Sequence, residues 1–113
     1  MAASVLLAAN PQWRPYHDHP FDLSGAYLSH AHWEGIDLSE MQMPRADLRR
    51  CDLRGANLER SLLIAAIVRE SNLTGVRMAG VRAHEADFSD ADLTGADMTH
   101  GGFCRAILAG STL

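Results

Sequence analysis

An apolar side chain recurs at every fifth residue from Leu23 to Leu113. The nineteen positions are Leu23, Leu28, Trp33, Leu38, Met43, Leu48, Leu53, Leu58, Leu63, Val68, Leu73, Met78, Ala83, Phe88, Leu93, Met98, Phe103, Leu108 and Leu113. An amphipathic helix repeats its apolar residues every 3.6 positions and a half-buried strand every two positions, so a period of five fits neither. The chain is therefore expected to change direction within every five residues.

Each of these central residues is preceded, two positions earlier, by a residue that is small in most units. Residues two apart in an extended segment share a face, so both are expected to point inward while the residue between them points outward. Seven of the nine glycines follow a central residue by two positions, where a tight corner with positive φ favours glycine. Each unit is therefore predicted to form one short strand and one corner.

A longer period of twenty residues sets the number of sides. It is carried by Gly35, Gly55, Gly75 and Gly95, and by Ala26, Ala46, Ala66, Ala86 and Ala106. Four units then make one coil, and residues twenty apart stack in columns about 4.8 Å apart. Inward positions also compensate in size, because Ser61 precedes Leu63, Val81 precedes Ala83 and Gly101 precedes Phe103.

Segments such as ADLRR, CDLRG, ANLER, SNLTG, ADFSD, ADLTG and ADMTH resemble the A(D/N)Lxx motif of the pentapeptide-repeat family. The resemblance covers residues 21–113 and implies an all-β fold, a right-handed quadrilateral β-helix of about four to five coils. Residues 1–20 are expected to form a short N-terminal cap over the first coil, because the terminal repeats of a solenoid need cover. The units SLLIA, AIVRE, VRMAG, VRAHE and GGFCR depart from the motif.

Catalytic and metal chemistry find little support in the pattern. No two of the six histidines share a column, since His30 aligns with Arg50 and Glu70, and His84 aligns with Ile64 and Cys104. No nucleophile, base and acid converge in a pocket. We therefore expect no enzymatic activity, no metal site and no cofactor.

Composition limits the class of partner and the location. A formal net charge of −4 opposes direct nucleic-acid binding. The sequence has neither a secretory signal nor a membrane-length apolar run, and two cysteines do not form a disulfide framework. A cytoplasmic protein without membrane contact is the expectation.

Two groups of outward residues are candidates for a protein-interaction surface. Leu62, Ile64 and Ile67 form an apolar patch that is either an interface or the place where the N-terminal segment folds back. Asp87, Asp90, Asp92 and Asp97 lie in an acidic stretch, whereas the arginines crowd into the earlier coils. The Asp and Asn residues before each central residue have a simpler explanation as local backbone hydrogen-bond acceptors.

The expected function is a non-enzymatic protein-binding or scaffold module that presents a regular surface to a protein partner. The resemblance implies one alternative, a DNA mimic acting on DNA gyrase or topoisomerase and conferring quinolone resistance. This chain departs from that pattern in its short length, its arginine-rich band and its scarcity of Phe at central positions. A second alternative, by analogy of fold alone, is an accessory or immunity module of a secretion or toxin system.

The chain ends at a central residue, and no covering segment follows it. Phe103, Leu108 and Leu113 would then be open to solvent at the last coil. The sequence predicts either a homodimer through this C-terminal coil or a fragment of a longer solenoid.

Overall fold

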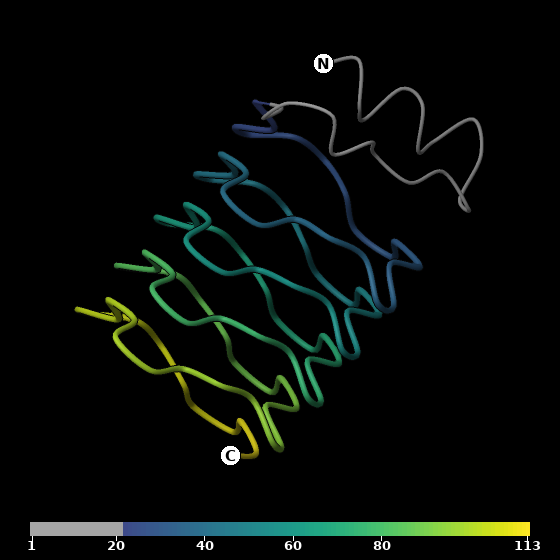
Figure 1. Ribbon diagram of the computed structural model, residues 1–113, viewed down its shortest axis with the longest axis vertical. Helices are drawn as coiled ribbons and strands as arrows, with labels where there is room; N and C mark the ends of the chain where they lie inside the picture. Colours follow the sequence, from purple (N-terminus) through teal and green to yellow (C-terminus); the bar gives the residue numbers. More distant parts are fainter. Residues whose placement is uncertain (1–21) are drawn as a thin grey trace.

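The computed structural model describes residues 22–113, which form a four-sided β-solenoid. Each outward residue forms a parallel bridge with the residue twenty positions later, from Asp22 with Gln42 to Asp92 with Thr112. Figure 1 shows the coils stacked along one axis, from the blue coil at one end to the yellow C-terminus at the other. The predicted coil of twenty residues is confirmed, whereas the predicted cap of residues 1–20 lies outside the described residues.

The coils and faces are named here by their residues. Coils 1 to 5 are residues 22–41, 42–61, 62–81, 82–101 and 102–113. The outward residues of face 1 are Asp22, Gln42, Leu62, Arg82 and Gly102, and those of face 2 are Tyr27, Asp47, Ile67, Asp87 and Ile107. Those of face 3 are His32, Asp52, Asn72, Asp92 and Thr112, and those of face 4 are Asp37, Asn57, Arg77 and Asp97.

One unit, residues 52–56, shows how the backbone hydrogen bonds are satisfied. The Asp52 N–H donates to the preceding coil (2.9 Å), and the N–H groups of Leu53 and Gly55 donate to the next coil (both 2.9 Å). The Ala56 N–H closes the corner on the Leu53 carbonyl (3.0 Å). Only the Arg54 N–H has no backbone acceptor, and the Asp52 carboxylate accepts it (3.3 Å). Each unit therefore leaves one donor that a side chain must satisfy.

The sides are shorter than the predicted strands. Within residues 22–113 every extended segment is a single bridged residue, with no longer strand. The reason is that the corner begins at the central residue itself, whose carbonyl accepts the hydrogen bond that closes the turn, as Leu23 does from the Ala26 N–H (3.0 Å). One residue per unit is then left to pair as a strand residue.

The predicted positive φ appears at the second residue after every central residue from 25 to 110. Seven of these corner positions are glycine, and eleven carry side chains, for example Ala65 at 58° and Glu85 at 61°. The coil imposes this conformation whichever residue is present. The non-glycine corners carry a local conformational cost, which the stacked hydrogen bonds outweigh.

The interior is a continuous apolar column in which the two inward positions are fully buried through coils 2 and 3. Trp33 and Phe88 are its largest members. Small polar residues that face inward find backbone acceptors: the Ser61 hydroxyl donates to the Leu58 carbonyl (2.8 Å), and the Ser71 hydroxyl donates to Leu48 (2.6 Å). No buried side-chain polar atom of the described residues lacks a partner.

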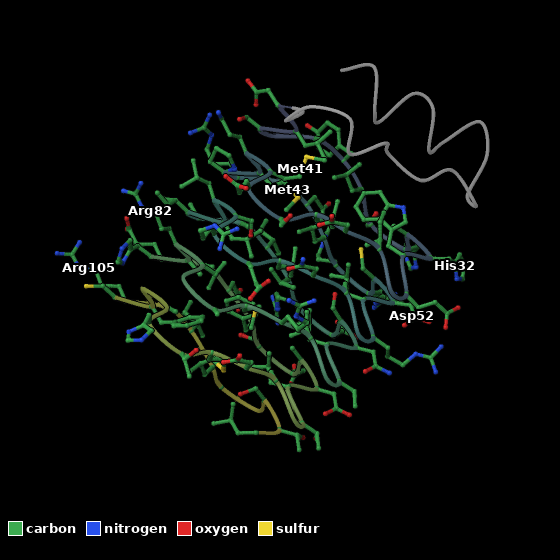
Figure 2. The ribbon with its side chains drawn as sticks, in the orientation of Figure 1. His32, Met41, Met43, Asp52, Arg82 and Arg105 are labelled. Carbon is green, nitrogen blue, oxygen red and sulfur yellow. The ribbon has the colours of Figure 1, made fainter. Side chains whose placement is uncertain are left out.

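Size compensation at face 1 is seen directly at Gly101, where a Cβ atom would collide with Cε2 of Phe103 and lie 3.2 Å from Cδ2. Met41 and Met43 are an exception, because both residues of this inward pair are large and both are at 0% exposure. Figure 2 shows these two side chains near each other. Methionine is unbranched and flexible, which allows two of them to share a space that a rigid pair would overfill.

Candidate protein-interaction surface

Three of the four large apolar residues that the structure places on the surface of residues 22–113 share one column. They are Tyr27, Ile67 and Ile107 on face 2, with exposed fractions of 74%, 38% and 48%. They occupy coils 1, 3 and 5, and Asp47 and Asp87 lie between them in coils 2 and 4. Of these three residues, only Ile67 was predicted from the sequence. The twenty-residue period was the available signal for the other two, because Tyr27 and Ile107 each lie forty residues from Ile67.

The predicted apolar patch wraps the corner between face 1 and face 2. Leu62 and Ile64 lie at face 1 and are half-buried, Ala65 is the corner residue, and Ile67 lies on face 2. Pro44 lies in the Ile64 column and is half-buried as well. The patch therefore continues from face 1 into the apolar column of face 2.

The acidic candidates are not brought together. Asp87 lies on face 2, Asp90 at the corner between faces 2 and 3, Asp92 on face 3 and Asp97 on face 4. They form a band around coil 4 rather than a patch on one face. Residues adjacent in sequence are separated in this way because each corner turns the chain onto the next face.

The outward aspartates and asparagines accept the one backbone N–H of their unit that has no backbone acceptor. All nine of them, Asp22, Asp37, Asp47, Asp52, Asn57, Asn72, Asp87, Asp92 and Asp97, accept the N–H two residues later at 3.0 to 3.3 Å. The hydrogen bonds from the Thr94 hydroxyl and N–H hold the pKa of Asp92 below its usual value. At Asp87, burial raises the pKa, but hydrogen bonds from Ser89 outweigh it, and the pKa is lowered. The local-acceptor interpretation of these residues is confirmed.

A shallow groove of about 290 Å³ lies beside face 2, at its corner with face 3. It is lined by Ser29, His30, Arg49, Arg50, Arg69 and Glu70. Sequence analysis missed this groove, because the three arginines come together only when coils 2 and 3 stack. The twenty-residue alignment of Arg49 with Arg69 was the available signal.

Each groove arginine already has one carboxylate partner. Arg49 binds Asp47 through two hydrogen bonds (Nε–Oδ1 2.9 Å and Nη2–Oδ2 2.8 Å). Arg50 pairs with Glu70 at 3.3 Å, and Arg69 pairs with Asp87 at 3.8 Å. The arginine side chains remain 49% to 60% exposed. A guanidinium has five N–H donors, so these groups retain donors for a further acidic ligand.

A second set of arginines lies on face 1, at Arg82, and at the corner between faces 1 and 2, at Arg45 and Arg105. Among the interactions of residues 22–113, no ion pair or hydrogen bond involves the side chains of Arg45, Arg82 or Arg105. Figure 2 shows Arg82 and Arg105 extending from the same side of the solenoid, opposite His32 and Asp52 of face 3. These arginines flank the apolar patch, and Glu85 lies between Ala65 and Arg105 in the corner column.

The two cysteines are free thiols in different settings. Burial raises the pKa of Cys51 to about 12, which keeps it protonated and inert. Cys104 is exposed, and its N–H donates to Nδ1 of His84 (3.2 Å). His84 thus replaces the missing outward cap, since residue 102 is glycine. A side chain at Gly102 would collide with the His84 ring.

At the last coil, Phe103 and Leu108 are half-buried against the core, and Leu113 is 74% exposed. The Phe103 ring packs at a tilt of 59° against Phe88, with centroids 6.0 Å apart. These positions agree with the predicted inward orientation of the first two residues. The predicted C-terminal interface stays a prediction.

Among the described residues no group of His, Cys, Asp and Glu is arranged to hold a metal ion. The same residues contain no helix that is long and apolar enough to cross a membrane.

These features define a class of protein: a four-sided β-solenoid in which backbone stacking builds the scaffold and the outward columns form its surface. The chain belongs to the pentapeptide-repeat family, whose model matches eight copies over residues 22–60, 63–100 and 86–113. No curated protein matches the sequence.

Solved structures of the same family resemble the solenoid. Rfr23, a pentapeptide repeat protein from the cyanobacterium Cyanothece 51142, has a TM-score of 0.81 and 27% identity over 83% of this chain and 65% of its own. A pentapeptide repeat protein from the thylakoid lumen of Arabidopsis thaliana has a TM-score of 0.77 and 24% identity over 80% and 63%. The protein alr5209 from Nostoc PCC 7120 has a TM-score of 0.74 and 22% identity over 100% and 94%. This chain thus spans less than two thirds of the first two structures. The similarity supports the right-handed quadrilateral β-helix of the family.

Proposed function

We propose that the chain is a non-enzymatic module that binds a protein partner through face 2 and the adjoining apolar patch of face 1. The observation that carries the proposal is the column in which Tyr27, Ile67 and Ile107 stay exposed. Burying a branched or aromatic side chain of this size contributes about 1.5 to 3 kcal/mol when it is complete. Covering the exposed part of this column is therefore a source of binding free energy.

The fold does not need apolar residues at these positions. Asp or Asn there would accept the N–H two residues later, as it does in nine other units. With Leu62, Ile67 and Ile107 in place, no hydrogen bond within residues 22–113 is donated by the N–H groups of Ile64, Arg69 or Ala109. A hydrogen bond of this kind contributes about 0.5 to 1.5 kcal/mol. Local stability thus favours Asp or Asn, and contact with a partner explains the apolar residues.

The DNA-mimic alternative has less support from the surface charges. A mimic of duplex DNA needs continuous negative charge along its length. Here Arg54 pairs with Glu34 (3.2 Å) and Asp52 (2.6 Å), and Arg60 pairs with Glu40 (3.6 Å). These pairs interrupt the negative charge over coils 1 and 2. Failure of the purified chain to relieve quinolone inhibition of gyrase supercoiling would agree with the protein-binding proposal.

The proposal is tested with an Ile67→Asn/Ile107→Asn double variant, which replaces both apolar side chains by the residue used as a cap at Asn57 and Asn72. The matched control is His32→Asn at the same unit position on face 3. We expect affinity capture from native lysate to retain a defined partner with the wild-type and control chains, and to lose it with the double variant. Equal capture by all three chains would refute the proposed surface.

The same variants separate a partner from an intramolecular cover. If the N-terminal segment of this chain covered the patch, the double variant would melt at a markedly lower temperature. A partner surface predicts instead a melting temperature close to that of the wild type, because the lost apolar contacts and the new caps are of similar size.

A further inference from the structure

We infer that the partner contacts face 2 with an amphipathic α-helix whose apolar residues recur every seven positions and whose acidic side chains lie against Arg49, Arg50 and Arg69. The inference rests on the proposed function and specifies the partner by its chemistry. It is carried by the spacing of the apolar column and by the charge of the groove beside it.

The spacing of the column distinguishes a helix from a strand. Outward residues of adjacent coils are bridged, so Ile67 and Ile107, two coils apart, are separated by about 9.6 Å along the axis. Seven residues of an α-helix rise about 10.5 Å, which matches to about 1 Å. Same-face residues of an extended strand lie about 6.8 or 13.6 Å apart, and neither distance matches.

The residues between the apolar side chains leave room for such a contact. Asp47 is only 9% exposed, and its carboxylate is held by Arg49 at the corner. The Asp87 carboxylate is held by the Ser89 N–H (3.0 Å) and by Arg69. Both carboxylates are thus occupied at the corner. The apolar side chains remain as the contact points of face 2, and a helix with one apolar residue per two turns fits this alternation.

Charge determines which helix fits. The groove with Arg49, Arg50 and Arg69 runs along the edge of face 2 over coils 2 and 3, and its guanidinium groups are half exposed. A carboxylate on the adjacent flank of the bound helix would reach the guanidinium donors that these intramolecular pairs leave free, and a hydrogen bond between two charged groups is stronger than one between neutral groups. Glu70 also lines this groove, and its negative charge would repel an acidic side chain placed beside it. The acidic side chains of the helix are therefore placed on the arginine side of the groove.

A second copy of this chain fits face 2 less well. Two copies related by a two-fold axis through Ile67 would place Tyr27 against Ile107 of the other copy, but they would also place Asp47 against Asp87. Both carboxylates are already paired with an arginine of their own copy, so this contact would desolvate two ion pairs without adding a partner for either. The heterologous helix avoids this contact.

The test uses synthetic 21-residue, alanine-rich peptides and fluorescence anisotropy. The probe has Leu at positions 4, 11 and 18 with Glu along one flank. One control peptide has Lys in place of the flanking Glu, and another has the same composition with Leu at alternate positions. We expect the probe to bind the wild-type chain and the His32→Asn control, and both control peptides to bind at least tenfold more weakly.

Two variants of the protein complete the test. Ile67→Asn/Ile107→Asn and Arg50→Glu should each weaken binding of the probe at least tenfold, with circular dichroism showing a retained fold. Absence of probe binding, or equal binding by the strand-patterned peptide, would overturn the inference. If lysate capture still depends on Ile67 in that case, the proposed function stands and only the helical partner is excluded. A wild-type dimer in light scattering that Ile67→Asn dissociates would instead assign face 2 to a second copy.

Discussion

Replacing Gly101 by valine should destabilise the protein, because the Phe103 ring occupies the space into which the new side chain would project. A Cβ at residue 101 would collide with Cε2 of Phe103 and lie 3.2 Å from Cδ2 and 3.1 Å from the Met98 carbonyl oxygen. The backbone of Gly101 has no positive φ, so the obstacle is steric and not conformational.

The magnitude follows from two opposing contributions. Overpacking costs about 1 to 3 kcal/mol. Replacing glycine lowers the entropy of the unfolded chain, which offsets about 0.4 to 1 kcal/mol. The net loss should be about 1 to 2 kcal/mol, and in a domain of this size each kcal/mol lowers the melting temperature by about 4 to 8 °C.

The preceding coil supplies a matched rescue. There the same two inward positions are Val81 and Ala83, both at 0% exposure. The double variant Gly101→Val/Phe103→Ala reproduces that pair and should be more stable than the sum of the two single changes predicts. Urea titrations of the wild type, both single variants and the double variant measure this coupling. Additive effects, or an unchanged Gly101→Val midpoint, would refute size compensation at these positions.

Three further outcomes are expected. Ala66 lies in the alanine column with 0% exposure, so Ala66→Leu should lower the free energy of unfolding by about 1 to 3 kcal/mol in urea titration. Ala79→Leu, at a half-buried corner, should lower it by less. Equal losses would contradict the inward assignment of Ala66. A corner with positive φ favours glycine, so Ala65→Gly at φ 58° should raise the melting temperature. Gly75→Ala at φ 68°, where a Cβ would meet nothing within 4 Å, should lower it. The reverse order would show that φ does not control the stability of these corners. Hydrogen bonds from Thr94 hold the folded-state pKa of Asp92 below its usual value of 3.8. The stabilisation from this carboxylate is therefore present above the unfolded-state pKa and should be lost as the pH falls through the folded-state pKa, and Asp92→Asn should reduce this acid dependence of the melting temperature.

The five- and twenty-residue periods were sufficient to predict the architecture. They identified the inward and outward positions, the corners and the stacking of residues twenty apart, because a repeat applies the same local rules to every unit. The same periodicity predicted the caps, since an outward Asp or Asn is two residues from the N–H that it accepts. It also predicted that Ala66 faces inward and that Gly101 makes room for Phe103.

Sequence alone was less informative about the surface. Asp87, Asp92 and Asp97 are close in sequence, yet the structure places them on three faces, because each corner turns the chain. Ile67 and Ile107 are forty residues apart, yet they share one column.

The arginine groove likewise depends on tertiary structure. Side-chain rotamers decide that Arg50 reaches Glu70 and that Arg49 folds onto Asp47. A repeat determines where a Cα lies, but these long side chains choose among several partners within reach. Sequence therefore determined the scaffold, and only the stacked coils decided which side chains share a surface, because that depends on contacts across the coils and not along the chain.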